Sequence, residues 1–161
     1  MIRIGLVGYG KAGAAVAEVL QADPRYALCW VARHQALAPT QRVGDVEVPA
    51  FSLAQGTLAP WLDQNPVDAL VDFSVPQSLQ IYGEELRRRR LMLVSAISAY
   101  TEEQLAYAKS LGQDTRVLCS PNITLGINFL IMAAKLLRSI APFADVEILE
   151  QHFKAKPEVS G

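Results

Sequence analysis

Three glycines near the amino end follow the spacing Gly8-x-Gly10-x-x-Gly13, between a short apolar run and a helix-forming stretch. In that setting the first glycine permits a tight turn off a strand, the second lets a pyrophosphate approach the backbone, and the third lets helix and strand pack closely. Free N–H groups at the helix start then face the anion. We expect a dinucleotide site here; a purely structural glycine turn is the alternative. The predicted contacts are Gly8, Tyr9, Gly10, Lys11, Ala12 and Gly13.

The end of the second predicted strand bears on which dinucleotide binds. An acidic residue about twenty positions after the last motif glycine would bind the ribose 2′-hydroxyl of NAD. This sequence has Ala32 followed by Arg33 at that place. A guanidinium pairs strongly with phosphate oxygens, so we predict that Arg33 binds the 2′-phosphate of NADP(H). NAD(H) stays open as a second cofactor, and the alternative for Arg33 is a solvated loop cation.

Two further strand ends are candidates for the same site, because ligands of doubly wound sheets bind outside the carboxyl ends of the strands. Asp72-Phe-Ser-Val-Pro76 closes one strand and places Phe73 and Ser74 on the nicotinamide side. The segment Ser95–Ala99 follows the next strand, and we expect Ala96 and Ser98 to line the cofactor cleft.

Strand and helix patterns alternate along the chain, and the strands are almost entirely apolar. This favours an α/β fold, a Rossmann-type doubly wound parallel sheet covered on both faces. Pro39, Gly44 and Pro49 indicate a surface loop over Arg33–Pro49, within which Val46–Val48 is a possible short strand. The predicted strands are Ile2–Val7, Ala27–Ala32, Ala69–Asp72, Leu91–Val94, Val117–Ser120 and Asp145–Gln151, and the predicted helices are Lys11–Gln21, Pro60–Gln64, Pro76–Arg89, Thr101–Leu111 and Leu125–Ile140.

Half of the 161 residues are apolar and the formal net charge is −1. We therefore expect no nucleic-acid partner, and no apolar run is long enough to span a bilayer. The N-terminus lacks the layout of a signal peptide. Cys29 and Cys119 have no metal-type spacing, so we expect no metal site, and buried thiols in a reducing cytoplasm. The expected partner is a small-molecule substrate.

Four motifs, in order, resemble the 4-hydroxy-tetrahydrodipicolinate reductase (dihydrodipicolinate reductase) family of lysine and diaminopimelate biosynthesis. The resemblance implies a cytoplasmic homotetramer that uses NAD(P)H to reduce a cyclic imine dicarboxylate, 4-hydroxy-tetrahydrodipicolinate, to tetrahydrodipicolinate. It also implies a dinucleotide-binding domain over residues 1–122 and, over residues 123–161, the start of an α+β substrate and oligomerisation domain. The motifs are Asp72-Phe-Ser-x-Pro76, Tyr100-Thr-Glu-Glu-Gln-Leu105, Ser120-Pro-Asn-Ile-Thr-Leu-Gly-Ile-Asn128 and Asp145-Val-Glu-Ile-Leu-Glu-Gln-His-Phe-Lys-Ala-Lys156.

The resemblance assigns roles to residues in the second half. His152 falls at the family's acid–base histidine and Lys156 at its assisting lysine. Hydride delivery to a ring carbon conjugated to an imine leaves an enamine-like anion, which a histidine titrating near neutral pH can protonate. A lysine ammonium can hold a substrate carboxylate. The alternative for His152 is a strand-end histidine with a structural hydrogen bond. The family's nicotinamide-contacting element matches Ser120, Pro121, Asn122 and Ile123, for which a Pro-Asn turn at a helix start is the alternative.

The sequence departs from the family pattern at several places. The family's Gly-Thr-Thr-Gly loop is Ala96-Ile-Ser-Ala99 here, and the second histidine of its pair is Phe153. Its substrate loop appears only as Glu158-Val-Ser-Gly161, in which Ser160 and Gly161 are the predicted substrate contacts. Because the sequence stops inside that loop, we expect a truncated substrate domain, or one that a partner completes. On this view these residues bind NADPH but turn over the substrate poorly.

Two other functions are compatible with the sequence. The opening Ile2-Arg-Ile-Gly-Leu-Val-Gly-Tyr-Gly10 is also similar to diaminopimelate dehydrogenase, an NADP-dependent amine oxidoreductase. That family explains His152 and Lys156 less well. A non-catalytic NADP-binding module is the third interpretation, and the altered Ala96–Ala99 loop, Phe153 and the early end of the sequence give it some support.

Overall fold

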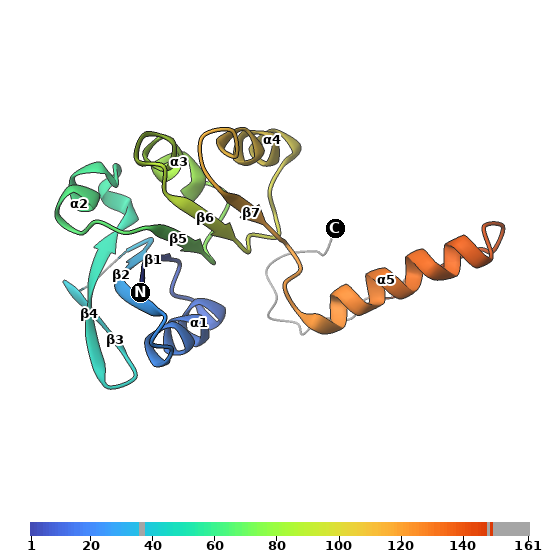
Figure 1. Cartoon of the computed structure of the whole chain (residues 1–161), viewed down its shortest axis with the longest axis horizontal. Helices are drawn as coiled ribbons and strands as arrows, with labels where there is room; N and C mark the ends of the chain where they lie inside the picture. The colour runs from blue at the N-terminus through green and yellow to red at the C-terminus, as the bar shows by residue number, and fades with distance from the viewer. Residues whose placement is uncertain (36–37, 148, 150–161) are drawn as a thin grey trace. The chain divides into compact units, whose positions relative to one another are not determined.

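The computed structural model describes residues 1–35, 38–147 and 149, and it separates into two compact units, residues 1–121 and 122–161 (Figure 1). The first unit contains a seven-stranded sheet of order β3-β4-β2-β1-β5-β6-β7 within the described residues. Every neighbouring pair is parallel except β3 and β4. The predicted Rossmann-type α/β sheet is confirmed. The strands are β1 (Ile2–Val7), β2 (Tyr26–Arg33), β3 (Thr40–Val43), β4 (Val46–Ser52), β5 (Ala69–Asp72), β6 (Met92–Ser95) and β7 (Val117–Cys119).

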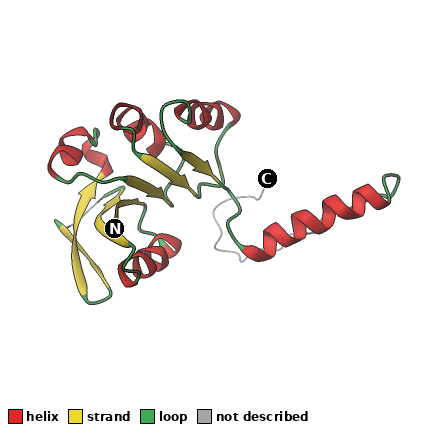
Figure 2. Cartoon of the chain, in the orientation of Figure 1, coloured by secondary structure: helices red, strands yellow, loops and turns green. Residues whose placement is uncertain are grey.

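Helices pack on both faces of this sheet, and each face has its own apolar cluster (Figure 2). Ile4 and Leu6 of β1 point to the face that α1 covers with Ala17 and Leu20. The opposite face carries the larger cluster, built from β-strand side chains and from α2, α3 and α4. The helices are α1 (Lys11–Ala22), α2 (Ala59–Gln64), α3 (Ser78–Arg89), α4 (Glu102–Leu111) and α5 (Leu125–Ile140), with a short 3-10 helix at Leu53–Gln55.

The two faces are not covered equally along the sheet. The larger cluster extends to β6 and β7 through Leu93, Val117 and Cys119. On the other face, Val94 is 39% exposed and Leu118 is 59% exposed. The α1 side of the sheet is therefore covered only as far as its central strands within the described residues.

The predicted surface loop Arg33–Pro49 is wrong, because most of it forms an antiparallel hairpin of β3 and β4. Gly44, with φ of 57°, makes the tight turn between the strands. Buried Val43 and Val48 join the α1-side cluster. The sequence reasoning found Val46–Val48, but a four-residue edge strand is too short to show a hydrophobic period. The hairpin extends the sheet beside β2, where the predicted nucleotide contact Arg33 ends its strand.

The other predicted elements of the first unit have boundaries that agree with the structure to within two residues, whereas the 3-10 helix Leu53–Gln55 was not predicted. The spacing Thr101-x-x-Gln104 is typical of a helix cap, and the structure has a capping box at the start of α4. The Thr101 hydroxyl accepts a hydrogen bond from the backbone N–H of Gln104, and the Gln104 side-chain oxygen accepts one from the backbone N–H of Thr101. These reciprocal bonds satisfy two donors that the first helical turn leaves unpaired.

The second unit contains α5, none of whose residues is buried. The predicted strand Asp145–Gln151 is wrong for its described part, since residues 145–147 and 149 form no strand. A strand is stabilised by hydrogen bonds to a neighbouring strand, and the described residues offer none in this unit. Residues 148, 150 and 151 lie outside the described residues. In the part of the chain that the structure describes, no helix has both the length and the apolar character needed to span a membrane.

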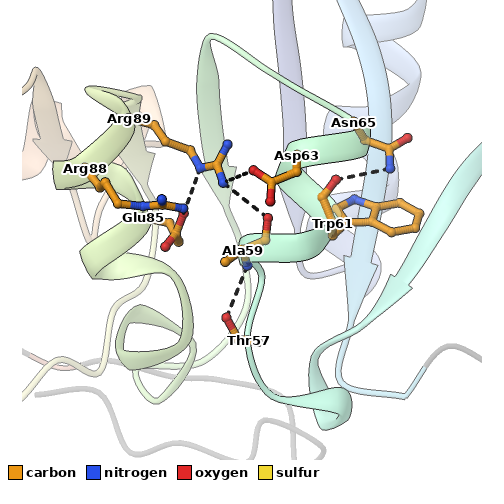
Figure 3. Close-up of polar contacts among 8 residues, drawn as sticks. All are labelled: Thr57, Ala59, Trp61, Asp63, Asn65, Glu85, Arg88 and Arg89. Atoms are coloured by element: carbon orange, nitrogen blue, oxygen red, sulfur yellow. Dashed lines mark hydrogen bonds and ion pairs between the residues drawn. The ribbon is translucent and has the colours of Figure 1, made fainter.

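One arginine ties α2 to α3 on the more heavily covered face (Figure 3). The Arg89 guanidinium donates to Glu85 on its own helix at 2.7 Å and to Asp63 of α2 at 2.5 Å. It also donates to the Ala59 carbonyl oxygen at 3.3 Å. Its neighbour Arg88 bonds to Glu85 of the same helix, whereas Arg87 donates to Asp114 and to Ser110 of α4. Arg87 and Arg89 therefore both join α3 to another part of the fold.

A second ion pair holds β1 to the segment before β5. The Arg3 side chain donates to both carboxylate oxygens of Asp68, at 2.7 and 3.3 Å, and the Arg3 N–H donates at 2.9 Å. The side-chain hydrogen bond from Arg3 is the main reason that the pKa of Asp68 falls from 3.8 to about 2.

This shift predicts a pH-dependent effect of Asp68→Asn on stability. Because the pKa of Asp68 is lower in the folded state than in the unfolded state, its stabilisation is complete above pH 3.8 and disappears as the pH falls through about 2. Urea titrations at a series of pH values should show Asp68→Asn less stable than wild type at neutral pH, with a difference that narrows as the pH falls and vanishes below about pH 2. Asp45→Asn, which removes a longer surface contact, is the control. A difference independent of pH would contradict this account.

Candidate nucleotide-binding site

Backbone contacts hold the glycine loop between β1 and α1 beside the end of β2 and beside the segment after β5. Gly8 has φ of 90°, and its N–H donates to the Ala32 carbonyl oxygen at 2.8 Å. A Cβ at Gly8 would lie 2.6 Å from backbone atoms of Phe73 and Ser74, and a Cβ at Gly13 would lie 2.1 Å from the Gly8 carbonyl oxygen. Both positions therefore require glycine for the backbones of β1, α1 and the end of β5 to meet.

Gly10 has the opposite environment. A Cβ there would meet no atom within 4 Å, and the residue is the N-cap of α1 without a side-chain cap hydrogen bond. The first turn of α1 contains no acidic residue, and Lys11 and Ala12 are exposed. Open space beside an uncapped helix start leaves N–H groups available to an anion. This arrangement fits the pyrophosphate of a dinucleotide.

Arg33 lies beside this loop at the end of β2. Its guanidinium carbon is 5.9 Å from the centroid of the Tyr9 ring, and its Nη1 donates to the Gln41 side chain at 3.0 Å. The Tyr9 hydroxyl donates to the Arg42 carbonyl oxygen at 3.0 Å, and burial is the main cause that raises the pKa of Tyr9. Sequence reasoning missed Gln41 and Arg42 because it interpreted the hairpin as a loop.

The end of β5 holds a buried carboxylate. Asp72 accepts hydrogen bonds from the Ser74 N–H at 2.7 Å and the Ser74 hydroxyl at 2.5 Å, and from the Tyr82 hydroxyl of α3. Burial raises the pKa of Asp72, while these hydrogen bonds lower it. The Phe73 N–H donates to the Val7 carbonyl oxygen at 2.8 Å, so the segment after β5 runs beside the glycine loop.

Hydrogen bonds of a buried side chain also hold the segment that follows β6. The buried Ser95 hydroxyl lies 2.9 Å from the Tyr100 hydroxyl and accepts a longer hydrogen bond from the Ile97 N–H. The Ala96 N–H donates to the Asp72 carbonyl oxygen, and the Ser120 N–H donates to the Ser95 carbonyl oxygen, both at 2.9 Å. The segments after β5, β6 and β7 are thus joined at the carboxyl edge of the sheet.

The structure brings most of the predicted cofactor contacts to this one edge, in the first unit: the residues are Gly8, Tyr9, Gly10, Lys11, Ala12, Gly13, Arg33, Phe73, Ser74, Ala96, Ser98, Ser120 and Pro121. Asn122 and Ile123 belong to the second unit, where the Asn122 carbonyl oxygen accepts a hydrogen bond from the Asn128 side chain. The predicted catalytic pair His152 and Lys156 and the predicted substrate contacts Ser160 and Gly161 lie outside the described residues.

Residues 2–123 match the family model described as the N-terminus of dihydrodipicolinate reductase. The chain belongs to this family. A 4-hydroxy-tetrahydrodipicolinate reductase of Methylococcus capsulatus is 28% identical over 97% of this chain and 59% of its own length. The enzyme of the same name from Myxococcus xanthus is 29% identical over 73% of this chain and 42% of its own length. The chain thus spans about half the length of the curated relatives it matches.

Solved structures show the same fold. A dipicolinate-bound dihydrodipicolinate reductase from Paenisporosarcina sp. TG-14 has a TM-score of 0.63 and 21% identity, and the match covers 86% of this chain and 54% of the other. RSP, a Rex-family repressor in complex with NADH, has a TM-score of 0.59 and 11% identity over 87% of this chain and 61% of the repressor. At these identities the likeness concerns the fold alone.

The contrast between Gly10 and Gly13 yields a prediction. Gly10→Val should leave the free energy of unfolding within about 1 kcal/mol of wild type, because the side chain enters open space. It should weaken NADPH binding at least about tenfold, since the side chain takes the space of the pyrophosphate. Gly13→Val should cost about 3 kcal/mol of stability through its clash with the Gly8 carbonyl. Urea unfolding measures the stability of both variants, and NADPH fluorescence titration measures their affinity. Unaltered NADPH affinity in a folded Gly10→Val chain would exclude this loop as the phosphate site.

Proposed function

We propose that this chain supplies the nucleotide-binding part of a reductase that uses NADPH to convert 4-hydroxy-tetrahydrodipicolinate to tetrahydrodipicolinate. The observation that carries the proposal is the family match over residues 2–123, a segment in which Gly10 leaves the start of α1 open to a phosphate. The curated relatives are named as reductases of this substrate, which favours this reaction over oxidative deamination of diaminopimelate and over a sensor without catalysis.

The surroundings of Arg33 support a preference for NADPH over NADH. The exposed guanidinium ends β2 beside the glycine loop, and Ala32 occupies the place of a carboxylate that would repel a 2′-phosphate. The Arg33 guanidinium contacts the Gln41 side chain and the Tyr9 ring, and among the described residues it has no carboxylate partner. A guanidinium so placed can form charge-assisted hydrogen bonds to phosphate.

The roles that we assign to the other residues follow the chemistry of ring reduction. Loss of the substrate's hydroxyl group as water leaves a ring double bond conjugated to the imine, and the nicotinamide, when bound, supplies a hydride to that unsaturated ring. Backbone N–H groups of residues 10–13 bind the pyrophosphate, and the segments after β5, β6 and β7 orient the nicotinamide ring. His152 donates the proton that completes the reduction, and Lys156 holds a substrate carboxylate. We assign further substrate contacts to Ser160 and Gly161, and we extend the proposal to a cytoplasmic homotetramer.

Replacing Arg33 tests the cofactor preference. Arg33→Ala should weaken NADPH binding about tenfold or more, because a charge-assisted hydrogen bond contributes about 1.5–3 kcal/mol. NADH affinity should stay as in wild type. Arg42→Ala is the matched control, since the Arg42 side chain contacts Gly44 and Asp45 at the hairpin turn. Isothermal titration of both nucleotides against the three proteins gives six constants, and equal affinities for NADPH in wild type and Arg33→Ala would assign the 2′-phosphate elsewhere.

Replacing His152 tests the reaction. In a form of the protein that turns over the cyclic imine, His152→Ala should lower kcat about 10²- to 10⁴-fold, the usual contribution of a general acid. NADPH affinity should be nearly unchanged, because the residue acts on the substrate. Turnover is followed by the loss of NADPH absorbance. Undiminished turnover would exclude His152 as the acid, and oxidation of diaminopimelate without reduction of the cyclic imine would favour a dehydrogenase.

A further inference from the structure

Buried polar side chains gather at one part of the carboxyl edge. In the part of the chain that the structure describes, the buried polar residues other than tyrosine are Asp72, Ser78 and Ser95. Asp72 and Ser95 end neighbouring strands and are directly paired in the register of β5 and β6. Both side chains are almost inaccessible, at 0% and 1% exposure.

Two tyrosines bond to these residues. Tyr82, fully buried in α3, donates its hydroxyl to the Asp72 carboxylate. Tyr100 follows β6 and bonds to the Ser95 hydroxyl at 2.9 Å. The hydrogen bonds of Asp72 to Ser74 and Tyr82 therefore hold the segment after β5, and the bond between Ser95 and Tyr100 holds the segment after β6.

Stability does not account for these buried hydrogen bonds. A carboxylate taken out of water loses hydration, and its three donors here are neutral groups. Well-packed apolar side chains of similar volume stabilise a core as well or better. Fully satisfied polar groups do hold one another in one geometry, because each hydroxyl has a defined partner. The contribution of Asp72 and the two tyrosines is therefore to orient the groups to which they bond.

We propose that Asp72, Tyr82 and Tyr100 are positioning residues, which hold the segments 73–75 and 96–99 in the geometry that receives the nicotinamide ring. The inference rests on the proposed function, because it concerns the same nucleotide. The bonds of Asp72 to Ser74 fix the first segment. The bonds of Ser95 to Tyr100 and to the Ile97 N–H fix the second, whose sequence is Ala96-Ile-Ser-Ala99.

The test compares two ligands that differ in the nicotinamide. NADPH contains the ring, and 2′-phospho-ADP-ribose keeps both ribose groups, the pyrophosphate and the 2′-phosphate but lacks it. Tyr82→Phe and Tyr100→Phe each remove one hydroxyl and keep the ring that packs. Each should raise the Kd for NADPH about five- to tenfold and leave the Kd for 2′-phospho-ADP-ribose as in wild type. Tyr107→Phe is the control, because the Tyr107 hydroxyl of α4 bonds to Glu84, away from the strand ends.

Each outcome of this comparison is decisive. A loss for NADPH alone supports the positioning role. Equal losses for both ligands, with a lower melting temperature, would mean that these hydrogen bonds serve the fold, and no loss for either would make the hydroxyls irrelevant to binding. If Tyr82→Phe loses its fold, Tyr100→Phe carries the test because its side chain is only half-buried. A wild-type chain that binds 2′-phospho-ADP-ribose but not NADPH overturns the inference alone, whereas one that binds neither ligand overturns the proposed nucleotide site as well.

Discussion

Backbone packs directly on backbone where β1, α1 and β5 meet, and the candidate site depends on that contact. The Gly8 carbonyl oxygen occupies the space that a side chain on Gly13 would need, and the backbone after Asp72 occupies the space beside Gly8. These contacts set the start of α1 at the carboxyl end of β1. With any larger residue at either glycine, α1 would have to move away, and its free N–H groups would no longer lie beside the ends of β1 and β5.

The parallel register then brings distant segments to the same edge. Ala32, Val7, Asp72, Ser95 and Cys119 form one row across five neighbouring strands. Each strand ends near this row, so the segments that follow it share one edge although they are far apart in the sequence. The two ends of the row differ in chemistry. Cationic Arg33 lies at the end of β2, and the hydrogen-bonded pairs Asp72–Tyr82 and Ser95–Tyr100 lie at the ends of β5 and β6.

That difference suits a ligand with two unlike ends. A phosphate bound near Arg33 benefits from an exposed cation that can adjust its position. A flat aromatic ring at the other end benefits from a rigid surface, because its orientation decides where a substrate can react. The departure of the Ala96–Ala99 segment from the family's Gly-Thr-Thr-Gly loop is compatible with this role, since Ser95 and Tyr100 hold both ends of the segment.

Local patterns in the sequence were enough to predict the glycine loop, the α1 start, the cap at Thr101 and the parallel strands, because each depends on residues within one or two turns or on a single apolar run. The tertiary structure alone decided the hairpin over residues 40–52 and the tyrosine links to Asp72 and Ser95. The Tyr9–Arg42 bond spans 33 positions and the Arg3–Asp68 bond spans 65. A sequence pattern shows that a tyrosine is apolar enough to be buried. Which carboxylate its hydroxyl reaches depends on how helices and strands from separate parts of the chain pack together.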